Sequence, residues 1–172
     1  LKNYLNDFQN NIASLSNFKS SIKALDEKII NILKIFINFE EKINILNDEL
    51  AIINKLFNDL KIKKQGILKL KIDNYNQYFQ SDMLLLKTKE TKKSINDLLS
   101  LIEINDLKGV IDNNVINIIS SLEKYINNFE VIFDSEDSNM ISWVEGDNKE
   151  SLIFISSPVS VDNYLKNSIF EN

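Results

Sequence analysis

The chain has 172 residues, of which 44% are hydrophobic and 26% are charged, values typical of a globular protein with one sizeable core. Its formal net charge of −5 argues against polyanion binding through bulk charge. Every basic residue is a lysine, and histidine and cysteine are absent. These absences exclude an arginine finger, the usual serine-hydrolase triad, thiolate zinc sites and disulfides.

Long helices are expected because only three glycines and one proline interrupt the chain. There is no secretory signal pattern and no apolar run long enough to span a bilayer, so the expected location is the cytoplasm and no membrane partner is expected. The chain opens on Leu1, inside an apolar pattern, rather than on Met. We therefore expect an excised domain of a longer protein.

Two amphipathic helices are predicted first. Apolar residues at spacings of three and four indicate one helix from Leu1 to about Lys19, and the same rhythm continues without glycine or proline from about Ile22 to Lys64. Gly66 marks a break. Helical spacing favours a helix over 67–79, although the alternation of Leu68, Leu70 and Ile72 with lysines leaves a short strand as the alternative.

Two further helices follow a connection at residues 80–82. One is predicted over Met83–Ile104, and the other over about Leu107–Phe129, with Gly109 favouring a start beyond it. These helices complete a predicted bundle of long antiparallel helices within residues 1–133.

The pattern changes in residues 134–172. An acidic loop over Asp134–Ser138 precedes a predicted strand over Met140–Glu145, and a second apolar run at Leu152–Ile155 ends at Ser156–Pro158. Asp162 suits the first turn of a final helix. The predicted fold class is therefore mainly α, a long-helix antiparallel bundle followed by a short β-hairpin and a C-terminal helix.

Metal and nucleotide sites are not expected. Di-metal helical bundles use a Glu-x-x-His unit, which needs histidine, so the neighbouring carboxylates such as Glu40 and Glu41 are interpreted as solvated. The acidic loop lacks the central glycine of a calcium loop. Neither G-x-x-x-x-G-K-[ST] nor G-x-G-x-x-G occurs. We expect no catalytic residue, metal site or cofactor in this chain.

Lysines form two groups that could contact a nucleic-acid backbone. The first group lies around Gly66 and the second near the start of a later helix, with Tyr75 and Tyr78 between them. Lysines mixed with aromatic residues suit a groove that tracks single strands, although a solubilising helix end is the alternative. The predicted nucleic-acid-binding residues are Lys61, Lys63, Lys64, Lys69, Lys71, Lys87, Lys89, Lys92 and Lys93.

The C-terminal segment carries a family resemblance. Trp143 and Glu145 form a W-x-E element on the first predicted strand, and the second apolar strand leads to Pro158. Val161, Leu165 and Phe170 then fall in a turn and a helix. This order resembles the region just before motif III of DinG/XPD-like superfamily 2 ATP-dependent DNA helicases, where a similar helix leads into a T-S-A-T-L motif.

The resemblance implies that residues 1–133 are the helical arch domain of such a helicase and residues 134–172 an edge of its first motor domain. The arch would help to enclose and guide single-stranded DNA beside motor domains of the same polypeptide. ATP and Mg would be cofactors of the parent helicase only, because the phosphate loop, the DEAH box and the arginine-bearing motif are not in this chain.

Two other functions stay open. The long predicted helix over 22–64 could pair with a partner helix, which would make the chain a structural or adaptor bundle. An enzyme that uses only lysines and carboxylates is the third possibility, although no spacing in the sequence supports it.

Overall fold

The computed structural model describes residues 1–16, 18, 30–63, 69–73, 77–107, 111–134, 136–146 and 151–159. The protein is mainly helical, with a small antiparallel sheet. In chain order the elements are β1 (Lys2–Tyr4), α1 (Leu5–Ala13), α3 (Ile30–Lys63), β2 (Lys69–Lys71), α4 (Ser81–Ile104), α5 (Asn113–Phe133), β3 (Met140–Gly146) and β4 (Leu152–Pro158).

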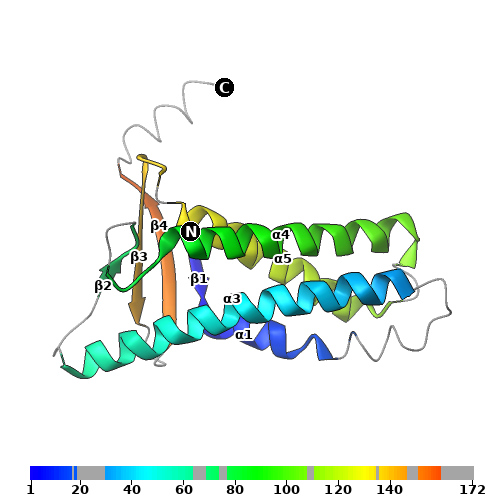
Figure 1. Cartoon of the computed structure of the whole chain (residues 1–172), viewed down its shortest axis with the longest axis horizontal. Coiled ribbons are helices and arrows are strands. Elements are labelled where there is room, and N and C mark those ends of the chain that lie inside the picture. The colour runs from blue at the N-terminus through cyan, green and yellow to red at the C-terminus, as the bar shows by residue number, and fades with distance from the viewer. Residues whose placement is uncertain are drawn as a thin grey trace.

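The helices run side by side along the long axis of the molecule, and the strands gather at one end (Figure 1). Helix α3 contains 34 residues, which gives it a length of about 50 Å. Its buried residues recur every three or four positions: Ile32, Phe36, Phe39, Ile43, Leu46, Leu50, Ile53 and Phe57. None of the helices in the described ranges is long and apolar enough to cross a membrane.

Small polar residues line part of the contact between α3 and α4. Thr88, Thr91 and Ser94 are buried on α4, and their hydroxyls donate to carbonyls four residues earlier in the same helix. Asn38 of α3 donates to the Ser94 hydroxyl across the interface, at 3.2 Å. These short side chains satisfy their polar atoms locally, so the two helices can pack with little side-chain bulk between them.

An aromatic cluster joins the bundle to the sheet. The Phe129 ring of α5 lies 5.2 Å from Phe8 of α1 and 5.4 Å from Phe154 of β4, edge to face in both cases. Phe133, one helical turn further along, stacks on Phe129 at 5.4 Å and meets Phe154 edge to face at 5.8 Å. All four side chains have no exposed surface, so this cluster is the common core of α1, α5 and the sheet.

The sheet has the strand order β1-β4-β3-β2, with every neighbouring pair antiparallel. Asn3, Phe154, Val144 and Leu70 lie opposite one another across the four strands. Phe154 packs on α5, so this row faces the helices and defines the inner face of the sheet. Side chains alternate between faces along a strand, and the residues on either side of each of these four therefore lie on the outer face.

The predicted helix from Leu1 is wrong at its beginning, because residues 2–4 form β1. Strand β1 pairs with β4, the Leu1 ammonium donates to the Ser156 carbonyl at 2.8 Å, and the Ser156 amide donates to the Leu1 carbonyl at 3.0 Å. The buried Asn3 amide donates to the Tyr125 carbonyl, and its oxygen accepts from Asn128, both on α5. These long-range hydrogen bonds outweigh the local helical pattern.

Residues 69–71 form β2 rather than a helix, so the strand alternative is correct and the expectation of a helix over 67–79 is wrong for its described part. Residues 77–78 form a turn, and α4 begins at Ser81, within the expected connection.

Helix α5 begins at Asn113, beyond Gly109, where the Asp112 carboxylate accepts from the Asn114 amide at 2.9 Å. This side-chain cap explains the start of α5.

The predicted hairpin is confirmed by the pairing of β3 with β4, although β4 continues through the serines to Pro158. The Ser142 hydroxyl donates to the Ser156 hydroxyl at 3.0 Å within the sheet, which satisfies both buried side chains.

The predicted C-terminal helix lies outside the described residues. Strands from both sides of the predicted 133/134 boundary share one sheet, and the division into two domains stays a prediction.

The aromatic cluster predicts a large and local stability effect. Phe154→Ala should lower the free energy of unfolding by about 3–5 kcal/mol, because it leaves a cavity between α5 and the sheet. Urea denaturation followed by circular dichroism measures the change. Val131→Ala on α5 is the matched control, since Val131 is 39% exposed and should cost little. Equal losses in the two variants would contradict the packing described here.

Candidate nucleic-acid interface

Most of the charged side chains on the outer face of the sheet are lysines. Two rows cross all four strands, Lys2–Ile155–Trp143–Lys71 and Tyr4–Ile153–Glu145–Lys69. Three lysines and one glutamate give these rows a formal charge of +2, although the whole chain carries −5. Four strands about 4.8 Å apart make a surface about 14 Å wide. This face is locally basic and partly aromatic.

Trp143, Glu145 and Lys69 form one interacting cluster on that face. The indole Nε1 of Trp143 donates to the Glu145 carboxylate at 3.2 Å, and the Lys69 ammonium lies 3.2 Å from the same carboxylate. The Lys69 ammonium also lies 5.8 Å from the centre of the Trp143 ring. Because residues 143 and 145 are two apart on a strand, they share a face, which is why the W-x-E spacing brings them together.

The surroundings of Glu145 favour its ionised form. Partial burial alone would raise the pKa of its carboxyl, but hydrogen bonds from Trp143 and Lys69 and the positive charges of Lys69 and Lys2 lower the pKa below its ordinary value. The carboxylate is therefore anionic at neutral pH. It holds the Lys69 ammonium near the indole ring, with the Lys69 side chain 60% exposed.

The β1 edge adds a polar pocket that was not predicted. Its cavity measures about 260 Å³ and lies between β1, α1 and α5. The lining residues are Lys2, Asn3, Tyr4, Asn11, Ser121, Lys124, Tyr125 and Asn128. Lys2 and Tyr4 belong both to this pocket and to the outer face, so the basic surface continues around β1 towards Lys124. No local signal along the sequence predicts this pocket, because Lys2 and Lys124 are 122 positions apart.

The second lysine group lies on α4, and its four members differ in their contacts. Lys87 pairs with Glu49 of α3 and Lys92 pairs with Glu130 of α5, each at 2.5 Å. These two lysines connect helices, which favours a structural role over a DNA contact. Lys89 and Lys93 are exposed and line a shallow surface with Asn96 and Asp97.

The other predicted lysines lie on β2 or near the end of α3. Lys71 is exposed on β2 and pairs with Asp73 at 3.1 Å. Lys61 and Lys63 belong to the last turn of α3, but their side chains and the whole of Lys64 lie outside the described residues.

The positions that carry the family resemblance are described only in part. Trp143 and Glu145 lie on β3, and Pro158 ends β4. Val161, Leu165 and Phe170 lie outside the described residues.

The described residues do not fit the cofactors implied for a parent helicase. In those parts of the chain, no three metal-ligating side chains come together. The sequence has no glycine-rich phosphate loop to hold a nucleotide and its Mg²⁺.

Comparisons with protein-family models, with curated proteins and with solved structures found no match to this chain. The resemblance to DinG/XPD-like helicases therefore stays a prediction that depends on the residues quoted for it.

The Glu145 cluster predicts a specific titration. The Glu145 carboxyl should titrate below an ordinary glutamate, and Trp143→Phe or Lys69→Met should raise its pKa, because each removes a group that favours the carboxylate. Carboxyl ¹³C NMR over an acid pH series measures the shift. Because folding lowers this pKa, the ionised Glu145 carboxylate adds to the free energy of unfolding at pH values above its unfolded-state pKa. This contribution is lost as the pH falls through the folded-state pKa. An unshifted Glu145 in the unsubstituted chain would refute the cluster.

Proposed function

We propose that this chain is an arch-domain fragment of a DinG-like ATP-dependent DNA helicase, and that the outer face of its sheet contacts single-stranded DNA. The observation that carries the DNA contact is the placement of Lys2, Lys69 and Lys71 on one face with Trp143 and Tyr4. The role is non-catalytic: the chain would guide a strand, and ATP hydrolysis would belong to other parts of the parent protein.

The chemistry of this face favours a single strand. Lysine ammonium groups attract phosphates without reading sequence, and exposed aromatic rings offer surfaces on which unstacked bases can lie. Tyr4 is 39% exposed, and Trp143 is half-buried. The chain has no arginine for bidentate recognition of guanine, so we expect binding that tolerates any sequence.

The link to a helicase depends on the Trp143–Glu145 element and on the long helices. Trp143 and Glu145 are hydrogen-bonded on the outer face, so the W-x-E element of the resemblance is a structural unit here. The long helices α3, α4 and α5 have the helical character expected of an arch. Flanking sequence in the parent gene tests the link directly: a DEAH-like box upstream and a T-S-A-T-L motif downstream are expected. Flanks with neither motif would exclude the helicase assignment but leave the DNA contact open.

The DNA contact predicts a defined loss on substitution. Lys69→Gln/Lys71→Gln should weaken binding of a fluorescein-labelled oligothymidine, measured by anisotropy at several salt concentrations. Each lost phosphate contact should reduce the slope of log affinity against log salt by about 0.7, so two lost contacts reduce it by about 1.4.

A charge-matched control separates this site from bulk electrostatics. Lys89→Gln/Lys93→Gln removes the same two charges from an exposed surface of α4 and should leave the slope nearly unchanged. Equal weakening by both double variants would show that the sheet face has no special role. Absence of binding by the unsubstituted chain at low salt would leave the fragment a scaffolding role only.

A further inference from the structure

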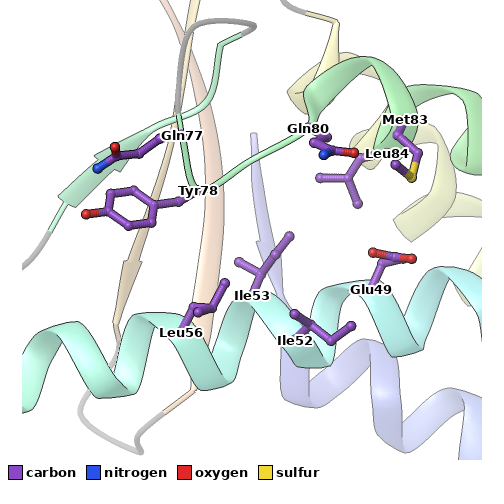
Figure 2. Close-up of a pocket in the computed structure, with 9 residues that line it drawn as sticks. All are labelled: Glu49, Ile52, Ile53, Leu56, Gln77, Tyr78, Gln80, Met83 and Leu84. Atoms are coloured by element: carbon purple, nitrogen blue, oxygen red, sulfur yellow. The ribbon is translucent and has the colours of Figure 1, made fainter.

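A second surface lies where α3 and α4 meet near the sheet. A groove of about 230 Å³ is lined by Glu49, Ile52, Ile53, Leu56, Gln77, Tyr78, Gln80, Met83 and Leu84. Figure 2 shows Ile52, Ile53 and Leu56 on α3 along one side, with Tyr78, Met83 and Leu84 on the other. Apolar side chains thus form both walls of the groove.

Several of these side chains are unusually exposed. Ile52 is 55% exposed, and Met83 and Leu56 are each 41% exposed. Ile45 lies two helical turns before Ile52 on α3, and Leu86 lies about one turn after Met83 on α4. Together with Tyr78, these residues make up six of the thirteen exposed large hydrophobic side chains found in the described residues. Four of the six, Ile52, Leu56, Tyr78 and Met83, line the groove itself, and Ile45 and Leu86 follow along the same two helices, which distinguishes a patch from scattered exposure.

The geometry suits a helix. Ile45, Ile52 and Leu56 are separated by seven and four positions, so they form a ridge along one side of α3. Helix α4 runs antiparallel to α3 beside this ridge (Figure 1). The seam between two such helices is where a third helix packs in a bundle, with its apolar residues at i, i+3, i+4 and i+7. The Lys87–Glu49 ion pair bridges the seam beside the groove.

The charges around the groove indicate which helix would fit. Asp48 lies one turn from Ile52, Asp59 one turn from Leu56, and Asp82 one turn from Leu86, and all three carboxylates belong to exposed residues. Lys87 and Lys42 are engaged by Glu49 and Glu90, which leaves Lys55 and Lys89 as the exposed lysines within one turn of Ile52 and Leu86 in the described part of the chain, against three exposed aspartates. The rim is therefore net acidic, and a second copy of this acidic chain would meet repulsion there.

We propose that the α3/α4 groove binds a basic amphipathic helix of a partner protein, whose apolar stripe fills the groove and whose flanking lysines or arginines meet Asp48, Asp59 and Asp82. This interaction is independent of the proposed DNA contact, because its residues come from α3, α4 and residues 77–84 rather than from the strands.

Synthetic helices test the proposal. The probe is an 18-residue peptide with leucines at i, i+3, i+4 and i+7 flanked by lysines. One comparison peptide has the same composition in scrambled order, and another has glutamates in place of the lysines. The amphipathic basic peptide should bind at least tenfold more tightly than either, by anisotropy, and should shift NMR signals of Ile52, Leu56 and Met83. Equal binding of the scrambled peptide, or no binding, would overturn the proposal.

Variants locate the site. Ile52→Gln/Leu86→Gln should weaken peptide binding at least tenfold, whereas Ile104→Gln, at a side chain already 78% exposed, should not. Asp48→Asn/Asp82→Asn should weaken binding and reduce its salt dependence. Oligothymidine binding should be unchanged in the groove variants, so failure here is distinguishable from failure of the DNA contact. A dimer detected by light scattering and abolished by Ile52→Gln/Leu86→Gln would assign the groove to a second copy instead.

Discussion

The burial of Phe154 against Phe129 and Phe133 is the interaction on which the rest of the structure depends. It fixes β4 onto α5, and because β4 is a central strand, it also sets which face of the sheet meets the helices. Side chains alternate along strands, so a one-residue slip would exchange the two faces. The outward placement of Trp143, Glu145 and the β2 lysines is thus a consequence of aromatic packing on the opposite side.

The sequence predicted the elements whose stabilising contacts are local or strongly periodic. Helix α4 and the β3–β4 hairpin were found with nearly correct limits, since both have clear apolar periods and nearby turn signals. Strand β1 was missed because its partner, β4, is about 150 residues away. Three residues carry too little pattern to reveal a strand, and Tyr4 fitted the helical rhythm of Leu5 and Phe8 equally well.

The residues of the candidate site were likewise predictable only where their signal is local in the sequence. Lys69 and Lys71 were identified because lysines cluster along the chain there, but the contribution of Lys2 and Lys124 depends on β1 closing the edge of the sheet. Lys87 and Lys92 resembled DNA contacts in sequence because their glutamate partners lie 38 residues away on other helices. A charge pattern on one helix shows where lysines are, whereas only the packing shows which of them connect one helix to another.

The acidic total of the chain hides a separation of charge that bears on both proposed surfaces. The outward rows of the sheet hold three lysines and one glutamate, and two of these lysines, Lys69 and Lys71, are ion-paired with Glu145 and Asp73. Around the α3/α4 groove the exposed Asp48, Asp59 and Asp82 outnumber the exposed lysines of the described residues. At physiological salt the screening length is about 8 Å, so each surface acts on a ligand largely by its own local charge. The two proposals therefore assign a polyanion and a basic helix to different elements of the same folded chain, and the local charge of each surface disfavours the ligand proposed for the other.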